Sequence, residues 1–232
     1  MPGPWGEAIK SVLAIKQLEF VAAAQEAGGE NNALVDWTGQ ASAPVLAWND
    51  EPPRITWLAQ LELAEALAPQ QPLLGWSPRL RAQVVGICHA LAGQDGLGWN
   101  RRTQLTGMVI SRGEAPPYMQ RMADRYGYSE AAYAAAEDKL VATLEWLREC
   151  LAAQSGVDSD YLVGTELSAA DLYLANFLGM LDPLPESMNP MPPQMRGAYS
   201  YRTEALEAAL DPLLLQHRER VYQRHIKTPL DF

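Results

Sequence analysis

The segment YLVGTELSAADLYLANFLGML, residues 161–181, constrains the fold more than any other part of the chain. Ser168 and Asp171 have the spacing of a helix N-cap and its reciprocal acceptor, and an apolar run follows them directly. A buried helix needs such a cap because its first four N–H groups have no acceptor within the helix. The Ser-x-x-Asp spacing alone is common, but in this setting it predicts a buried helix that begins at Ser168.

Helical periodicity dominates the chain beyond residue 78, where we find no convincing strand. The stretches with this periodicity are residues 79–93, 129–153, 168–181 and 203–225. We expect residues 182–199, which contain NPMPPQM, to form a loop because prolines interrupt regular structure. Residues 79–232 are therefore predicted to form an all-helical domain.

The first 67 residues predict a mixture of helices and strands. Apolar residues at helical spacing, including Ile9, Val12 and Leu13, predict one helix near the N-terminus and another that begins at Leu58. The short segments QLEFVA, APVLAW (43–48) and RITW (54–57) read as strands. Residues 68–78, APQQPLLGWSP, read as a linker, so we predict a small α/β domain over 1–67 and the helical domain over 79–232.

Composition excludes several classes of function. The net charge is −10 and no basic cluster stands out, so nucleic acid is not an expected partner. No apolar run approaches the length of a membrane span, and no secretory signal is evident at the N-terminus. Two cysteines, Cys88 and Cys150, fit a reducing cytosol, and the histidines match no metal-ligand spacing. We expect a cytoplasmic protein with no metal and no membrane partner.

Gly164, Ser168 and Asp171 together, in a chain whose α/β part precedes an all-helical part, resemble the folding motif of the glutathione transferase family. The resemblance implies a thioredoxin-like N-terminal domain, a purely structural role for these three residues, and glutathione as a co-substrate. It also implies a homodimer that acts on a small electrophile, as in detoxification.

The Ala43-Pro44 dipeptide, followed by Val45 and Leu46, resembles the family's cis-proline loop. In the family this loop offers main-chain groups, at the Ala43 position here, to the cysteinyl part of glutathione. The opening MPGPWGEAIK corresponds to the turn and first helix that follow the family's first strand. The resemblance thus implies that the first strand is missing, so that either the chain is shortened or something else fills the sheet.

The resemblance places the thiol-activating residue of the family either on the first strand, as a tyrosine, or at the start of the first helix, as a serine or cysteine. A tyrosine on the missing strand stays open, and the turn Gly3-Pro4-Trp5-Gly6 at the helix start has neither a hydroxyl nor a thiol. One route needs no side chain, because the unpaired N–H groups of Trp5 and Gly6 at a helix start could stabilise a thiolate. Trp57-Leu58 stands where the family usually has an acidic residue or Gln followed by Ser, and the first 75 residues have three bases against nine acids. The expected glutathione-binding residues are Trp5, Gln40, Ala43, Pro44, Arg54, Thr56 and Trp57.

A second-substrate pocket is expected around LAGQDGLGWNRR, residues 91–102, from His89, Trp99 and Arg102. An aromatic wall and a guanidinium could hold a planar or anionic molecule. The alternative is an interhelical loop with a packed Trp and surface arginines. Two functions remain open: a transferase that conjugates glutathione to an apolar or planar electrophile, and a non-catalytic member that uses the fold for binding or as a scaffold.

Overall fold

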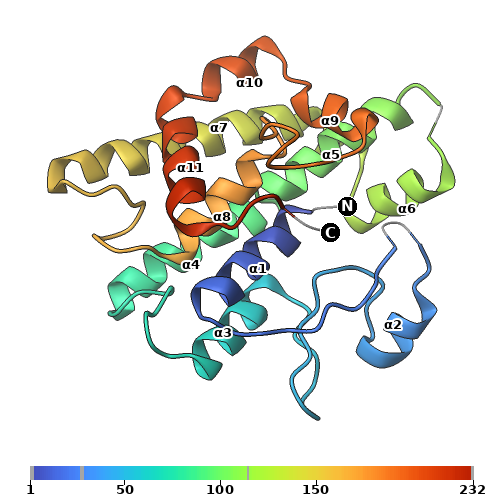
Figure 1. Ribbon diagram of the computed structural model, residues 1–232. Coiled ribbons are helices and arrows are strands. Elements are labelled where there is room, and N and C mark those ends of the chain that lie inside the picture. The colour runs from blue at the N-terminus through green and yellow to red at the C-terminus, as the bar shows by residue number, and fades with distance from the viewer. Residues whose placement is uncertain (1–2, 27–28, 114, 231–232) are drawn as a thin grey trace.

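The computed structural model describes residues 3–26, 29–113 and 115–230. Within these ranges the chain forms helices almost exclusively, and they pack around a central helix, α8, while α2 lies apart from the rest (Figure 1). The helices are α1 (Pro4–Ile15), α2 (Asn32–Thr38), α3 (Trp57–Leu67), α4 (Pro78–Ala92), α5 (Leu97–Ile110), α6 (Pro117–Arg125), α7 (Glu130–Gln154), the 3-10 helix η1 (Ser155–Val157), α8 (Ala169–Leu178), α9 (Pro193–Ser200), α10 (Glu204–Ala209) and α11 (Pro212–His225).

Helix α8 is the buried helix that the sequence predicts, since all ten of its residues are buried. It packs against α1, α4 and α11. One hydrophobic core runs from Ala8 in α1 through α8 to Leu230, so α1 belongs to the same core as the helical domain. Burial of this continuous apolar surface is the main force that holds the two parts of the chain together.

The predicted cap of α8 is present. Asp171 accepts from the Ser168 N–H at 2.8 Å, and the Ser168 hydroxyl donates to the same carboxylate oxygen at 2.7 Å. The other oxygen accepts from the Leu162 N–H at 2.8 Å and lies 3.2 Å from His217 Nε2 on α11. Gly164 has a φ of +68°, a conformation that side chains disfavour, which explains glycine there.

The N-terminal strands that the sequence predicts do not form within the described residues. Among the described residues, the only β-pairing is an isolated antiparallel bridge between Leu46 and Arg54, so the α/β, thioredoxin-like character of this part is not confirmed. The segments 17–22, 43–48 and 54–57 have the composition of strands. Apart from this one bridge, none of them pairs with another strand in the described residues. Thr56 and Trp57 instead begin α3, with the Thr56 hydroxyl accepting from the Ala59 N–H at 3.3 Å.

One prediction about the helical part needs correction, and two further segments gain detail from the structure. The expected loop 182–199 contains most of α9, because proline is tolerated at the first positions of a helix and Pro193 occupies one. The stretch 203–225 divides into α10 and α11 at Pro212. The 68–78 segment is a packed connection, in which Leu73 is buried and its carbonyl accepts from the Ala169 N–H at 2.8 Å.

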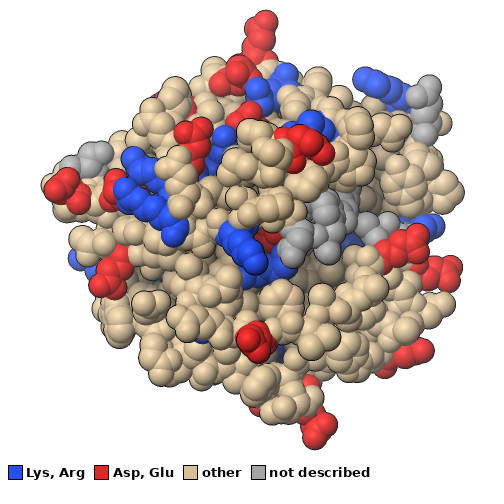
Figure 2. Space-filling model, viewed as in Figure 1, with Lys and Arg blue, Asp and Glu red and all other residues tan. Residues whose placement is uncertain are grey.

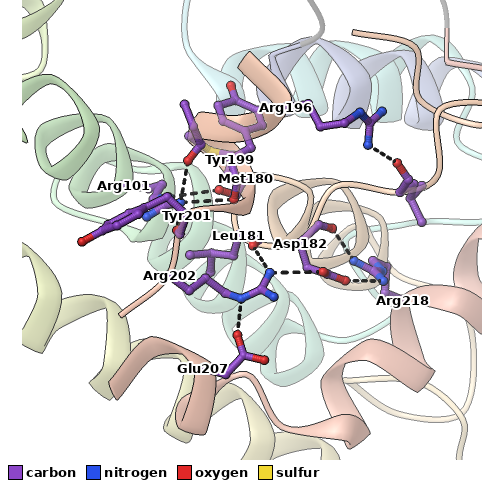
Figure 3. A network of polar contacts seen from close by, with 12 residues as sticks. Arg101, Met180, Leu181, Asp182, Arg196, Tyr199, Tyr201, Arg202, Glu207 and Arg218 are labelled. Atoms are coloured by element: carbon purple, nitrogen blue, oxygen red, sulfur yellow. Dashed lines mark hydrogen bonds and ion pairs between the residues drawn. The ribbon is translucent and has the colours of Figure 1, made fainter. Parts of the chain in front are cut away.

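Arg101 on α5 is fully buried and joins three parts of the helical domain (Figure 3). Its Nε donates to the Met180 carbonyl just beyond α8 at 3.0 Å, and a terminal nitrogen donates to the Tyr201 carbonyl after α9 at 2.6 Å. Its other terminal nitrogen donates to Gln104 Oε1 at 2.6 Å. Burial lowers the pKa of Arg101 to about 10, which still leaves it charged at neutral pH. The carbonyl groups at helix C-termini supply the negative potential that this cation needs.

Replacing Asp171 with alanine should destabilise the protein by about 3 kcal/mol or more, because two backbone N–H groups, a hydroxyl and His217 lose a buried anionic partner. Urea unfolding measures this loss. Asp138→Ala, at an exposed position of α7, is the matched control and should change stability by no more than about 0.5 kcal/mol. Equal effects of the two substitutions would contradict the proposed importance of the cap.

Arg101→Met should cost about 3 kcal/mol or more, since it leaves several buried carbonyls without a donor. Arg101→Lys should recover only part of the loss, because an ammonium cannot reach acceptors on as many sides as a guanidinium. Thermal and urea unfolding test both, with the exposed Arg79→Met on α4 as the control. Full stability of Arg101→Met would show that the Arg101 hydrogen bonds of Figure 3 contribute nothing to the fold.

Candidate functional site

The start of α1 is the first part of the candidate site. Gly3 is the N-cap, Pro4 is the first helical residue, and no side chain caps the helix. The first hydrogen bond of the helix runs from the Glu7 N–H to the Gly3 carbonyl at 3.1 Å. The N–H groups of Trp5 and Gly6 therefore have no acceptor among the described residues, as the backbone-only route requires.

The Trp5 side chain is turned into the helical domain. Its indole N–H donates to the Ala92 carbonyl at the end of α4 at 2.8 Å, and its ring meets Phe177 edge-on at a centroid distance of 4.9 Å. A Cβ atom at Gly98 would lie 2.7 Å from the indole, so glycine is required where α5 approaches this ring. Trp5 thus anchors α1 to α4, α5 and α8, and its ring donor is already occupied.

The Ala43-Pro44 bond is cis, as the resemblance implies. The Gln60 amide donates to the Pro44 carbonyl at 2.7 Å and to the Arg54 carbonyl at 3.1 Å, which fixes this loop against α3. No hydrogen bond engages the N–H or C=O of Ala43 within the part of the chain that the structure describes. These main-chain groups are available to a ligand.

The other residues expected to bind glutathione have partners inside the chain or lie at the surface. Arg54 forms an ion pair with Glu51 at 2.5 Å, and Thr56 caps α3. Trp57 packs between His89, at a centroid distance of 6.2 Å, and Tyr173, at 6.1 Å. Gln40 is half-buried in the loop after α2. No carboxylate-binding cation therefore stands free beside Ala43 in the described residues.

The residues expected to form a second-substrate pocket divide between two places. His89 lies on α4 beside Trp57, whereas Trp99 and Arg102 lie on α5. Trp99 meets Tyr126 edge-on at 4.9 Å, and the buried Arg102 guanidinium lies 5.6 Å from the centre of the Tyr199 ring. The expected interhelical loop is short, since residues 97–102 are already helical. Met180 and Met191 fill a small core cluster with Tyr199.

A small cavity lies beside the start of α1, where Pro4 and Glu7 face the end of α8. Its volume is about 20 Å³, enough for one water-sized sphere. The Tyr222 hydroxyl donates to Asn176 Oδ1 at 3.1 Å in its wall. The cavity is lined by Pro4, Glu7, Asn176, Gly179, Met180, Leu184, Asn189, Tyr199, Tyr222 and Leu230.

Sequence reasoning missed the polar residues of this cavity. Asn176 could have been suspected, because it is the one polar residue in the apolar run after Asp171. Glu7, Tyr199 and Tyr222 gave no such signal, since a polar residue on an amphipathic helix normally faces solvent. Burial raises the pKa of Tyr222, so its hydroxyl stays protonated and can donate.

Neither of the two cysteines is an activated nucleophile. Burial, together with the Asp171 carboxylate, raises the pKa of the Cys88 thiol, and burial raises that of Cys150. A raised pKa disfavours the thiolate that a cysteine mechanism needs. Among these residues there is also no cluster of side chains suited to a metal ion, and no helix long and apolar enough to cross a bilayer.

Comparison with known proteins identifies the helical part of the chain. Residues 130–215 match the family model described as glutathione S-transferase, C-terminal domain. No curated protein matches the sequence.

Several solved glutathione S-transferases have a similar structure. The enzyme of Methylobacillus flagellatus with glutathione bound has a TM-score of 0.65 at 15% identity, covering 96% of this chain and 91% of that one. The enzyme of Methylobacterium radiotolerans in complex with glutathione sulfonate also has a TM-score of 0.65 at 15% identity, over 100% and 93% of the two chains. A maleylacetoacetate isomerase of Methylobacterium extorquens with malonate and glutathione has a TM-score of 0.63 at 18% identity, over 96% and 89%. Residues 130–215 therefore correspond to a glutathione S-transferase C-terminal domain, and the chain has the fold of the solved glutathione S-transferases.

Proposed function

We propose that the protein binds glutathione between the start of α1 and the Ala43 loop and transfers it to a small electrophile. The observation that carries this proposal is the uncapped start of α1, where the N–H groups of Trp5 and Gly6 have no described acceptor. These groups and the positive end of the helix dipole favour an anion, and a thiolate is such an anion. The free main chain of Ala43 supplies a second anchor of the kind that binds a peptide.

The similar structures support glutathione as the ligand but do not bear on the reaction. Two of the solved proteins carry glutathione and one carries glutathione sulfonate. Their identity to this chain is 15% to 18%, so the electrophile and the mechanism here are proposals of our own. The Gly3–Gly6 turn has neither a hydroxyl nor a thiol, so the groups that we propose to stabilise the thiolate there are backbone N–H groups.

A second function, non-catalytic binding or scaffolding, is favoured by a different observation. The polar groups that would hold the ends of glutathione are engaged elsewhere: the Trp5 indole with Ala92, Arg54 with Glu51, and Thr56 with the start of α3. Glutathione has two carboxylates, and residues 1–75 have a formal charge of −6 (3 − 9). A weak or absent glutathione site would leave the fold as a binding module.

Substitutions at Gly3 separate these functions. Gly3 has a φ of −91°, and a Cβ there would meet nothing within 4 Å, so side chains are tolerated. Gly3→Asp should cap α1, place a negative charge at its start and lower the affinity for glutathione by about tenfold or more. Calorimetry and the ultraviolet absorbance of the bound thiolate measure this loss.

Gly3→Ala is the matched control, since it adds a Cβ without an acceptor and should bind glutathione as the unchanged protein does. Equal binding by Gly3→Asp would show that the thiolate does not lie at the start of α1. If the unchanged protein does not bind glutathione, the transferase proposal fails and the binding or scaffolding function replaces it.

A further inference from the structure

Arg102 on α5 is a buried cation without an anionic partner. The residue is 8% exposed. Among the described residues its Nε has no hydrogen-bond partner, and no carboxylate forms an ion pair with its guanidinium. Its neighbours are aromatic: the centre of the Tyr199 ring lies 5.6 Å from the guanidinium carbon, and Tyr126 is a second phenol close by. Because arginine stays protonated in proteins, a positive charge is buried here without compensation.

The other lysine and arginine residues that are buried in the described part of the chain have partners. Lys16 forms an ion pair with Glu65 at 2.8 Å, and Arg218 forms one with an aspartate at 2.9 Å. Arg101 donates to several carbonyl groups (Figure 3). A buried charge that lacks such partners lowers the stability of the folded chain, and a ligand of opposite charge recovers that loss when it binds.

Arg102 lies close to the start of α1. Gly98, one turn earlier on the same face of α5, is the residue at which a Cβ would lie 2.7 Å from the Trp5 indole. The Trp5 ring also lies 5.9 Å from the Tyr126 ring, and it packs against the apolar cluster that contains Tyr199. Arg102 and the start of α1 therefore share the same aromatic neighbours.

The groups around Arg102 define the chemistry of a ligand. A guanidinium is planar and binds both oxygens of a carboxylate through parallel hydrogen bonds. The Tyr199 hydroxyl is buried, has no hydrogen-bond partner among the described residues, and can donate to the same carboxylate. Trp99 and Tyr126 are half-buried and meet edge-on at 4.9 Å, which favours a flat apolar body next to the carboxylate.

The charge of the rest of the molecule makes a specific cation necessary for such a ligand. The net charge of the chain is −10, and Figure 2 shows Asp and Glu scattered over the whole visible face. An acidic protein surface repels small anions. A carboxylate is therefore bound only where a local positive group outweighs this repulsion, as the Arg102 guanidinium does.

We propose that Arg102 and the Tyr199 hydroxyl bind the carboxylate of the second substrate, so that the electrophile is a flat conjugated or aromatic acid. The role of this acid as the second substrate rests on the proposed transfer of glutathione, whereas the binding of a carboxylate at Arg102 does not. Glutathione also carries carboxylates, so the experiment has to separate the two sources.

The test uses the full chain without glutathione and two flat probes of the same shape, cinnamate and its neutral amide, cinnamamide. Calorimetry should show saturable binding of cinnamate and at least about tenfold weaker binding of cinnamamide. Arg102→Met should weaken cinnamate binding about tenfold or more, and Tyr199→Phe should weaken it by a smaller factor. Arg79→Met, which removes an exposed arginine of α4, is the matched control and should bind cinnamate as the unchanged protein does.

Thermal unfolding separates this role from a structural one. Because Arg102 has no anionic partner, Arg102→Met should unfold at the same temperature as the unchanged protein or at a higher one, in contrast to Arg101→Met. Cinnamate should raise the unfolding temperature of the unchanged protein but not that of Arg102→Met. The affinity for glutathione should be equal in the two proteins.

Four outcomes would overturn the proposal: equal binding of cinnamate and cinnamamide, no binding of cinnamate, full cinnamate binding by Arg102→Met, or unfolding of this variant at a clearly lower temperature. Loss of glutathione affinity in Arg102→Met would assign the carboxylate to glutathione and contradict the second-substrate role. If cinnamate binds as expected and glutathione does not bind at all, the proposed transfer fails while the carboxylate site at Arg102 stands.

Discussion

The buried carboxylate of Asp171 is the interaction on which the rest of the structure depends. It satisfies the N–H of Ser168 and of Leu162, and it faces His217 on α11. Without it, the N–H groups at the N-terminus of α8 would be buried and unpaired, and apolar contacts cannot replace the lost hydrogen bonds. Because α8 packs against α1, α4 and α11, the position of each of these helices depends on the stability of this one helix end.

The sequence predicted the parts of the fold that are determined by residues close together in the chain, and it missed those that depend on contacts between distant residues. The spacing of Gly164, Ser168 and Asp171 sufficed for α8 because a cap is formed by residues a few positions apart. Arg101 could not be recognised as buried, since its carbonyl acceptors lie 79 to 100 residues further along the chain. The prediction of strands was wrong for a related reason. The composition of 43–48 and 54–57 suits a strand, but a strand needs a partner to pair with. In these two segments the one bridge joins Leu46 and Arg54.

For the candidate site, the sequence indicated features of the backbone but not the direction of the aromatic side chains. The cis Ala43-Pro44 bond and the uncapped start of α1 agree with the sequence-based expectation. Trp5 and Trp57, expected beside glutathione, pack instead against the helical domain, through Ala92 and Phe177 in one case and His89 and Tyr173 in the other. A sequence gives no direction for an aromatic side chain at a helix start, because both a ligand and a neighbouring helix can bury it.

The anchoring of α1 by Trp5 has a consequence for how the molecule comes apart. Helices α1 and α3 share the hydrophobic core of the helical domain, whereas residues 17–56, which lie between them, contribute no buried side chain among those described. Helices α1 and α3 and the later helices that share their core therefore form one cooperative unit. Residues 17–56 form a loop that can open at a small free-energy cost while that unit stays folded. Stability therefore does not follow the order of the residues: the least stable part, residues 17–56, lies between two helices that belong to the most stable part.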